Sequence, residues 1–463
     1  MTSSTPPPER AAPRVQPARR VAYEVLRAVR EDDAYANLLL PTLLTEARLA
    51  PADAALATEL AYGTLRRRGY YDRVLSLVID RPIGKLDPEV LDALRLGVHQ
   101  LLSMRIAAHA AVGESVALVA SAGKGSAKGF ANGVLRTITR STPEEWHDRA
   151  LDGLSGDARL AVEHAHPDWV VAAFRAALAV DGRADELEAL LAADNEAPEV
   201  SLVALPGLAK VAEVGEPGGV SPVGARSAGG DPAGNEVVAS GRARVQDEGS
   251  QLAALALTRV RPVAPGERWL DLCAGPGGKA ALLAAEAALG GATLVANELI
   301  PTRARLVRNA LAVFDPPPEV LEGDARRFST ETPEGFDRVL LDAPCTGLGA
   351  LRRRPEARWR KKPSDVAELT GLQADLLDAA IAALRPGGIL AYVVCSPHLA
   401  ETRGVVEAAL ARHPTLTPLD TPAVLQAVAS GDLGLPPGTT VQLWPHRHGT
   451  DAMFIALLSK VLS

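Results

Sequence analysis

Three cysteines are the residues of this chain best suited to covalent chemistry, because each follows a short apolar run. Cys273 opens a glycine-rich segment, Cys345 follows Asp342-Ala-Pro, and Cys395 follows the run 389–394. Runs of this kind end at the carboxyl edge of an open α/β sheet, where such sheets bind their ligands. A single free cysteine is more often a small buried hydrophobe than a nucleophile. Two thiols delivered to one crevice beside a glycine turn predict covalent catalysis next to a bound cofactor.

The composition indicates a soluble protein of a reducing compartment. A chain of 463 residues is long enough for two or three domains. Its three cysteines exclude a disulfide framework, and aromatic residues at 4% argue against a stacking platform for single-stranded nucleic acid. We see neither a signal peptide nor an apolar stretch of bilayer length, and so expect a cytoplasmic protein without membrane association. A net charge of −7 leaves room for a local basic groove.

The residue patterns divide the chain into four parts. Residues 1–17 are rich in Pro, Ser and Arg and are expected to form a disordered tail. Residues 18–145 show helical spacing throughout and are expected to form an all-α domain of six or seven helices. Residues 146–241 predict a helical linker and a small variable subdomain, which includes the Gly/Pro-rich segment 206–234. Residues 242–463 form the fourth part.

Short apolar runs alternate with helical segments in this fourth part, which predicts a Rossmann-like α/β domain with a parallel sheet. The expected parallel strands are 268–273, 293–297, 319–322, 337–342 and 389–394. Two later runs, 441–444 and 452–457, are expected to form an antiparallel pair at the edge of that sheet.

A nucleotide-like cofactor is predicted by the segment that we call the glycine turn, Cys273–Lys279. Its members are Cys273, Ala274, Gly275, Pro276, Gly277, Gly278 and Lys279. Glycines let a ligand approach the backbone, and the helix start that follows offers unpaired N–H groups. Glu298 ends the next strand, where an acid can accept both hydroxyls of a ribose, and Asp324 ends the third, where it can meet an adenine amino group. Each acid alone would fit helix capping equally well, but their order after the glycine turn favours an adenosine site.

These residues, in this order, resemble the RNA cytosine-5 methyltransferases that use S-adenosylmethionine, the family of Sun and NOL1/NOP2 proteins. The matching pieces are Asp271–Lys279, Ala296–Glu298, Gly323–Asp324, Asp342–Gly347 and Tyr392–Ser396. In the first half of the chain, Glu59–Arg66, Leu94–Gly97 and Phe130–Arg136 resemble the helical RNA-binding domain shared with the antitermination factor NusB. The pairing is similar to the bacterial small-subunit ribosomal RNA methyltransferase B branch. The resemblance implies a NusB-like domain followed by a class I methyltransferase domain, S-adenosylmethionine as cofactor, and 16S ribosomal RNA as substrate.

The resemblance also implies a role for each thiol. A thiolate that adds to C6 of cytosine makes C5 nucleophilic, and the resemblance assigns this attack to Cys395 and release of the product to Cys345. DNA cytosine-5 methyltransferases use a Pro-Cys nucleophile instead, so the residues by themselves leave the two roles open. Asp342 is expected to bind the cofactor or, if protonated, to hold the N3/N4 edge of the base; its alternative role is to cap a turn. The sequence departs from the family pattern at Val394, where threonine is usual, and at Thr402, where asparagine is usual.

A basic segment that follows Cys345 is expected to contact RNA phosphates. Its candidate residues are Arg352, Arg353, Arg354, Arg358, Lys361 and Lys362. The alternative is a solvated charged loop, but the segment lies next to a site whose target base must leave its stack. Lys279 either contacts the cofactor or the cysteine loop, or lies in solvent. His446 and His448 lack further ligands at suitable spacing, so we expect loop residues and no metal site.

Two other functions use the same features. The same chemistry could act on transfer RNA or 23S ribosomal RNA, or the chain could be a non-catalytic RNA-binding factor in ribosome assembly. Cys345, Cys395 and Asp342 together argue against the second alternative, because a scaffold needs none of them. The sequence leaves the oligomeric state open, with a monomer favoured.

Overall fold

The computed structural model describes residues 15–227, 229 and 232–461. They belong to two units, one of residues 1–171 with 353–359 and one of residues 172–352 with 360–463. Most of the predicted disordered tail lies outside the described residues, and the first helix begins at Pro17. Among the described residues, we find no helix that combines the length and the apolarity needed to span a membrane.

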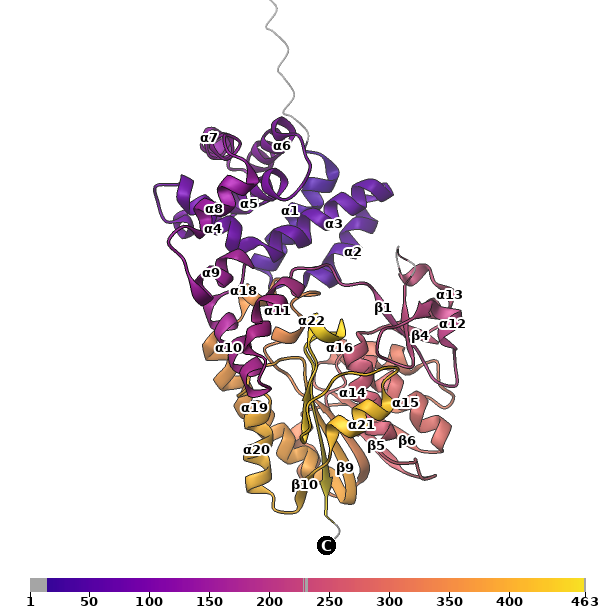
Figure 1. Cartoon of the computed structure of the whole chain (residues 1–463). Helices are drawn as coiled ribbons and strands as arrows, with labels where there is room; N and C mark the ends of the chain where they lie inside the picture. The colour runs from indigo at the N-terminus through magenta and orange to yellow at the C-terminus, as the bar shows by residue number, and fades with distance from the viewer. Residues whose placement is uncertain (1–14, 228, 230–231, 462–463) are drawn as a thin grey trace, which may run out of the picture. The chain divides into compact units, whose positions relative to one another are not determined.

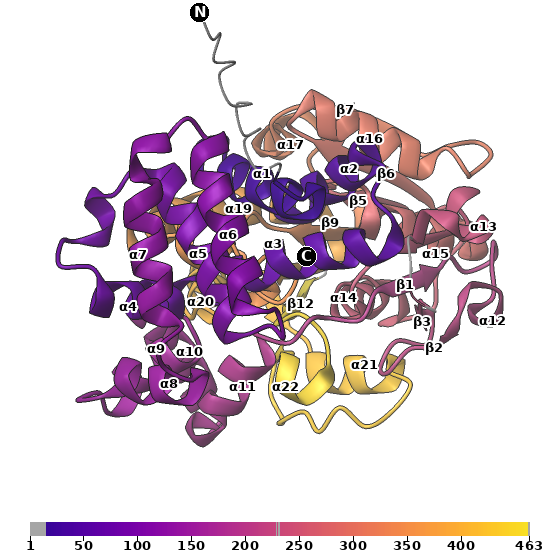
Figure 2. The same ribbon diagram turned by 90° about the horizontal axis from the view of Figure 1, so that it is seen from above.

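The first unit is all-helical, as expected from the spacing of its apolar residues. Its α-helices are α1 (Pro17–Glu31), α2 (Ala36–Ala47), α3 (Pro51–Arg66), α4 (Arg68–Val78), α5 (Pro88–Leu102), α6 (Ala108–Ser121), α7 (Lys128–Ile138), α8 (Pro143–Leu151) and α9 (Gly156–Glu163). Proline stands in the first turn of α1, α3, α5 and α8, where its missing N–H is not needed. Helices α5, α6 and α7 lie side by side (Figures 1 and 2). The seven helices between residues 17 and 138 confirm the predicted all-α domain.

The second unit contains a small antiparallel sheet that is separate from its main sheet. After α10 (Asp168–Val180) and α11 (Leu187–Ala193), its strands are β1 (Ser201–Ala204), β2 (Glu216–Pro217), β3 (Gly224–Arg226) and β4 (Ala243–Val245). Their order is β2-β3-β1-β4. The Gly/Pro-rich segment 206–234 contributes two of these strands and the short helix α12 (Val211–Val214). A further short helix, α13 (Glu236–Ala239), precedes β4.

The main sheet is mostly parallel, and its strand order is β10-β12-β9-β8-β5-β6-β7, with β11 paired to β12. The strands are β5 (Arg268–Asp271), β6 (Thr293–Glu298), β7 (Glu319–Glu322), β8 (Phe336–Asp342), β9 (Leu384–Val394), β10 (Leu416–Pro418), β11 (Thr440–Gln442) and β12 (Phe454–Lys460). All five predicted parallel strands are present. From β5 the chain builds outward through β6 and β7, and then returns to place β8 on the other side of β5. The strand order therefore reverses at the carboxyl ends of β5 and β8, and α/β sheets bind ligands in the crevice at such a point.

Both faces of the main sheet are covered by helices, so its strands are apolar on both sides. The helices that follow β4 in this unit are α14 (Glu248–Arg259), α15 (Gly278–Gly290), α16 (Pro301–Leu311), α17 (Phe328–Glu331), α19 (Pro363–Ala383), α20 (Arg403–Arg412), α21 (Thr421–Val428) and α22 (Pro445–His448). The short helix α18 (Ala357–Arg360) belongs mainly to the first unit. Apolar side chains of α14, α15, α16 and α21 share one buried cluster with one face of the strands. Those of α17, α19 and α20 share a second cluster with the other face. Figure 1 shows α19 and α20 along one side of this sheet.

The predicted antiparallel pair of residues 441–444 and 452–457 is present, but its predicted position at the edge is wrong. β11 pairs with β12 as expected. β12, however, lies between β9 and β10 and pairs with both. The sequence did not reveal β10, because a strand of three residues is too short to show an alternation of apolar and polar residues. With neighbours on both sides and helices on both faces, β12 is an interior strand.

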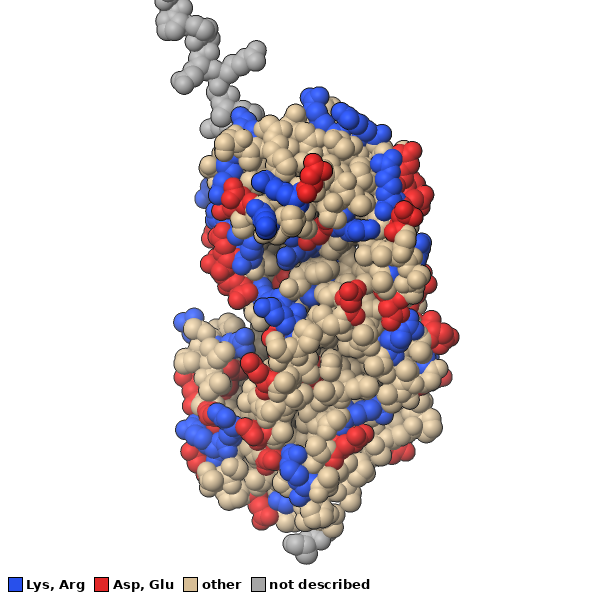
Figure 3. All heavy atoms as spheres, turned by 90° about the vertical axis from the view of Figure 1, so that its left-hand side faces the viewer, with Lys and Arg blue, Asp and Glu red and all other residues tan. Residues whose placement is uncertain are grey.

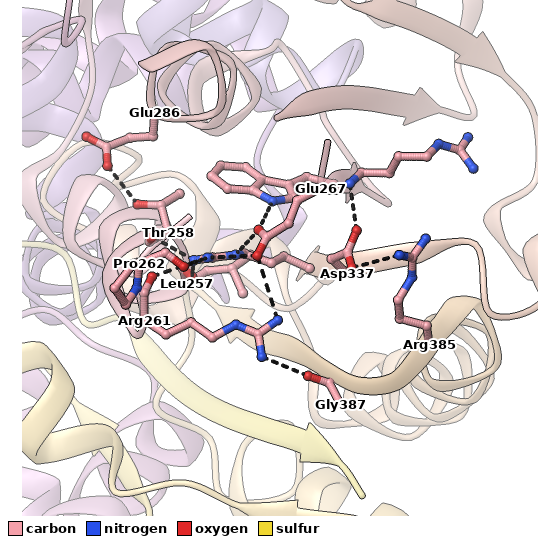
Figure 4. Close-up of polar contacts among 12 residues, drawn as sticks. Leu257, Thr258, Arg261, Pro262, Glu267, Glu286, Asp337, Arg385 and Gly387 are labelled. Atoms are coloured by element: carbon pink, nitrogen blue, oxygen red, sulfur yellow. Dashed lines mark hydrogen bonds and ion pairs between the residues drawn. The ribbon is translucent and has the colours of Figure 1, made fainter. Parts of the chain in front are cut away.

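A fully buried arginine anchors the amino end of β8. Arg338 donates to the Glu267 carboxylate at 2.8 Å and to the carbonyl oxygens of Leu257 and Thr258 at 3.0 and 2.6 Å. It also donates to the carbonyls of Arg261 and Pro262, so that one guanidinium closes the carboxyl end of α14 (Figure 4). The same guanidinium lies 4.9 Å from the centre of the Trp269 ring. This network joins α14, β5 and β8 at the amino ends of the two strands, the opposite end from the glycine turn.

Replacing Arg338 by leucine is expected to destabilise the protein by about 3–5 kcal/mol, because the Glu267 carboxylate would remain buried without its counter-charge. The matched control is Arg385→Leu, since Arg385 pairs with Asp337 at 2.9 Å but its side chain is 41% exposed. We expect that change to cost about 1 kcal/mol or less. Chemical denaturation of both variants measures the difference, and equal losses would contradict the special role of Arg338.

Candidate active site

The glycine turn connects β5 to α15 at the crevice, as predicted. Gly277 has a φ of +89°, and a Cβ there would lie 2.7 Å from the Cβ of Ala310, so conformation and space both require glycine. The N–H of Ala274 donates to the carbonyl of Asn297 and ties the turn to the end of β6. A Cβ at Gly275 would meet no other described atom within 4 Å. The backbone at Gly275 is therefore open to a ligand.

The two predicted adenosine-binding acids differ in what they contact. Glu298 is buried, and its two oxygens accept the N–H groups of Gly275 and Ile300, each at 2.9 Å. Each oxygen keeps a lone pair for a ribose hydroxyl while the carboxylate positions the glycine turn. Asp324 accepts the N–H of Arg326 as a helix cap and pairs with its guanidinium at 2.5 Å. The hydrogen bond from the Arg326 side chain lowers the pKa of Asp324. Capping is thus present at Asp324, and its contact with adenine stays a prediction.

Lys279 and Asp342 form an ion pair at the carboxyl ends of β5 and β8, with Nζ and Oδ2 2.7 Å apart; the lysine is buried and the Asp342 side chain is partly exposed. Burial by itself lowers the pKa of the Lys279 ammonium, but the Asp342 carboxylate outweighs this and raises it. Lys279 therefore contacts the cysteine loop region and not solvent. The contact of Asp342 with the cofactor or with the N3/N4 edge of the base stays a prediction.

Asp271, at the end of β5, is a buried acid in the same place. Neither of its carboxylate oxygens has a hydrogen-bond partner within the described residues. Burial, with the nearby Asp342 charge as the next cause, raises the pKa of Asp271 to about 8, although Lys279 partly opposes the shift. The folded protein therefore holds a proton here at neutral pH.

This shift predicts a pH dependence of stability. Between about pH 4 and pH 8 the folded protein binds a proton at Asp271 that the unfolded chain has released, so stability falls as pH rises through that window. Replacing Asp271 by asparagine should remove this component, which amounts to at most about 1.4 kcal/mol per pH unit. Free energies of unfolding across the window test it. If both proteins lose stability equally steeply, Asp271 is not the titrating group.

The two predicted catalytic thiols meet in the crevice. The Sγ atoms of Cys345 and Cys395 lie 3.4 Å apart, close enough for one thiol to donate to the other. The hydrogen bond with Cys395, together with burial, raises the pKa of Cys345 well above its ordinary value. The N–H of Gly349 donates to the carbonyl of Cys395 at 2.9 Å, and a Cβ at Gly349 would collide with the Ala452 carbonyl. Glycine at 349 thus allows the loop after Cys345 to approach the end of β9.

Glu401 joins the two cysteine loops, a role that the sequence did not reveal. Its fully buried carboxylate accepts the Thr346 N–H at 2.7 Å, the Thr346 hydroxyl at 2.5 Å and the Ser396 hydroxyl at 2.6 Å. Gln373 donates to Glu401 at 3.3 Å and to the Pro344 carbonyl at 2.8 Å. The sequence showed an acid five residues after Ser396, but only the folded chain brings Thr346 to it. Glu401 holds the residues next to both thiols in place.

Part of the predicted RNA-binding segment is buried. Arg352 donates to the Gly449 carbonyl at 2.7 Å. Arg358 is fully buried in the first unit and donates to the carbonyls of Arg66 and Ala165. These two guanidinium groups are engaged inside the protein, so the expectation that they contact RNA phosphates is wrong for this structure. On the face in Figure 3, basic and acidic side chains of the described residues are interspersed and form no continuous basic surface.

The His-x-His pair near the carboxyl end has structural partners. His446 Nε2 lies 2.8 Å from the Glu186 carboxylate, and His448 is buried with Nδ1 2.8 Å from the Trp444 backbone nitrogen. The two residues lie in the short helix α22 and not in the expected loop. Among the described residues, no group of three or more His, Cys, Asp or Glu is arranged to hold a metal ion.

Comparisons with known proteins agree with this arrangement. Residues 259–459 match the model of the 16S rRNA methyltransferase RsmB/F family, and residues 16–140 match that of the NusB family. A methyltransferase of Mycobacterium tuberculosis is 49% identical over 96% of this chain and 97% of its own length. Ribosomal RNA small subunit methyltransferase B of Pseudomonas putida is 34% identical over 96% of this chain and 98% of its own. The crystal structure of PH0851 has the same fold, with a TM-score of 0.77 and 24% identity over 97% of this chain and 100% of that one.

Proposed function

This chain belongs to the 16S rRNA methyltransferase RsmB/F family, and we propose that it methylates C5 of a cytosine in 16S ribosomal RNA through a covalent cysteine adduct. S-adenosylmethionine is its cofactor. The observation that carries the proposal is the pair of thiols 3.4 Å apart beside the glycine turn. The residues fit that cofactor: the backbone is open at Gly275, and the Glu298 carboxylate lies beside it at the end of β6.

C5 of cytosine is a poor nucleophile by itself. The reaction therefore requires a nucleophilic residue of the enzyme that first attacks C6. A thiolate forms a bond to C6, and the electrons of the C5–C6 double bond make C5 nucleophilic. The cofactor, when bound, supplies an electrophilic methyl group on its sulfonium. A base in the site then removes the C5 proton, the C6–sulfur bond breaks, and the thiolate is regenerated.

The surroundings of the two sulfur atoms support different roles for them. The pKa of Cys345 is raised by its hydrogen bond with Cys395 and by burial, and a raised pKa suits a residue that acts as a thiol. The Lys279 ammonium interacts electrostatically with Cys395, and a positive charge favours a thiolate. We therefore assign the attack on C6 to Cys395. Cys345 then assists release of the methylated base.

Single alanine variants at the two cysteines should separate these roles. Cys395→Ala is expected to abolish methylation and leave no covalent RNA adduct, because the attacking sulfur is absent. Cys345→Ala is expected to permit attack but stall release, so that a protein–RNA adduct accumulates and survives denaturing electrophoresis. The measurement uses 16S ribosomal RNA and radiolabelled S-adenosylmethionine.

Two results would count against this assignment. An adduct with Cys395→Ala and none with Cys345→Ala would reverse the roles. Full activity in both variants without an adduct in either would exclude covalent catalysis. Cys273→Ala is the matched control, because burial raises the pKa of this third thiol and keeps it protonated. It should yield no stalled adduct.

RNA contact is proposed for the part of the basic segment that remains accessible. Lys361 is partly exposed and Lys362 is exposed, at the start of α19. Arg353 and Arg354 are also partly exposed. These four residues follow the Cys345 loop in the chain, and their positive charge suits phosphate groups.

Neutralising Lys361 and Lys362 together, as glutamines, should weaken RNA binding and reduce its salt dependence. Each lost phosphate contact lowers the slope of log K against log salt by roughly 0.7–0.9. The control is the double variant Arg261→Gln, Arg385→Gln. Both arginines are partly exposed and lie near the amino ends of the strands. Filter binding at several salt concentrations measures the slopes. Equal slopes in wild type and the lysine variant would show that Lys361 and Lys362 make no contact with RNA phosphates.

A further inference from the structure

The two thiols that follow β8 and β9 are placed to form a bond with each other. Their Sγ atoms lie 3.4 Å apart. A disulfide bond is about 2 Å long, so small rotations of the two side chains bring the sulfur atoms to bonding distance. Cys345 and Cys395 are both partly exposed, which lets a small oxidant reach them.

The backbone around the two sulfur atoms holds them together. The strands β8 and β9 are neighbours in the main sheet, and the N–H of Gly349 donates to the Cys395 carbonyl at 2.9 Å. The Glu401 carboxylate accepts hydrogen bonds from Thr346 and from Ser396, the residues that follow the two cysteines. The two loops cannot separate without breaking these hydrogen bonds, so the thiols remain within reach of each other.

The surroundings of the two thiols differ, and the difference decides which sulfur reacts first with an oxidant. The Lys279 ammonium interacts electrostatically with Cys395, and a positive charge favours the thiolate, the form that attacks a peroxide. The hydrogen bond with Cys395, together with burial, raises the pKa of Cys345, so that Cys345 stays a thiol. A reactive cysteine beside a second thiol that resolves its oxidised form is the arrangement found in redox-sensitive proteins.

We propose that Cys345 and Cys395 form a reversible disulfide bond when the protein meets a hydroperoxide, and that this bond stops methyl transfer. The Cys395 thiolate attacks one oxygen of hydrogen peroxide, the O–O bond breaks, and a sulfenic acid and hydroxide form. The Cys345 thiol then attacks the sulfenic sulfur, the S–O bond breaks, and water leaves. The hydroxide takes up the proton that Cys395 lost on ionisation. Two thiols are thus oxidised by two electrons, and one peroxide is reduced to two molecules of water.

The effect on activity rests on the proposed covalent mechanism, whereas formation of the bond does not. A Cys395 sulfur that is bonded to Cys345 cannot add to C6 of cytosine. The cofactor contacts proposed at Gly275 and Glu298 involve neither sulfur, so the oxidised protein should still bind S-adenosylhomocysteine. A dithiol reduces the bond by thiol–disulfide exchange and restores both thiols.

Mass spectrometry of the full-length protein tests whether the bond forms. Hydrogen peroxide should lower the mass by about 2 Da, the two hydrogens lost from the thiols. Of the three free cysteines, only Cys273 should remain open to alkylation after denaturation, and a digest should contain the peptide that joins Cys345 to Cys395. The matched control, Cys273→Ala, should form the same bond at the same rate. Three alkylated cysteines after peroxide treatment, or a bond that includes Cys273, would overturn the inference.

Single variants test the order of the two steps. In Cys345→Ala the sulfenic acid has no resolving thiol and should be oxidised further to a sulfinic acid, which adds about 32 Da and is not reversed by dithiothreitol. In Cys395→Ala the remaining Cys345 should react roughly tenfold more slowly, because burial still disfavours its thiolate. Equal oxidation rates in the two variants, or full reversal of the oxidised Cys345→Ala by dithiothreitol, would contradict the proposed order.

Methylation assays on 16S ribosomal RNA test the effect on activity. Activity should fall in proportion to the fraction of cross-linked protein and return after dithiothreitol. Affinity for S-adenosylhomocysteine should change by less than about twofold. The melting temperature should not fall, because the bond joins loops that already touch.

Two failures of these assays are distinguishable. Cross-linked protein that still methylates RNA would exclude control of activity by the bond. Reduced wild-type protein that does not methylate 16S ribosomal RNA would contradict the proposed function, and control of that activity with it, while the mass measurement would still decide whether the bond forms.

Discussion

The position of β8 between β5 and β9 is the constraint on which the site depends. Parallel pairing sets Asp271 of β5 opposite Leu340 of β8, and Asp342 of β8 opposite Val393 of β9. This register brings the ends of three strands together, and those ends carry the glycine turn and both cysteine loops. At the other end of β8, the Arg338 guanidinium ties the strand to Glu267 and to the end of α14. β8 thus carries the buried Arg338 near its start and Asp342, which pairs with Lys279, at its end.

Ionisable groups gather at the carboxyl ends of β5 and β8, and two of them, Asp271 and Lys279, are buried. Asp271, Lys279 and Asp342 lie together, and the pKa values of the first two are shifted upward for different reasons. Burial and a like charge act on Asp271, whereas an opposite charge acts on Lys279. Such shifted groups are characteristic of catalytic sites, where the charge needed for chemistry is retained at the expense of stability.

Support for the thiols comes from outside the two cysteine motifs. Glu401 accepts hydrogen bonds from residues adjacent to both Cys345 and Cys395, and Gly349 allows their loops to approach. A separation of 3.4 Å between two sulfur atoms is therefore maintained by a carboxylate and a glycine as much as by the strands. The same division applies to the cofactor side, where Glu298 positions the glycine turn while the backbone at Gly275 stays open. A preorganised binding site requires such a backbone, held in place by contacts within the protein.

The sequence by itself determined the fold class, the five parallel strands and the motifs at their ends. The spacing of apolar residues indicates the local secondary structure, and the residue types in the motifs indicate the chemistry. It did not determine partners across the chain. Arg358 looks like a solvent-exposed charge in a basic run, yet it is buried against carbonyls from distant segments. Lys279 could have contacted the cofactor, the cysteine loop or solvent, and the fold places its ammonium 2.7 Å from Asp342. The sequence predicted β12 to be an edge strand, because its second neighbour, β10, is too short to be recognised from the residue pattern. In each case the deciding contact joins residues far apart in the chain, and only the tertiary structure brings them together.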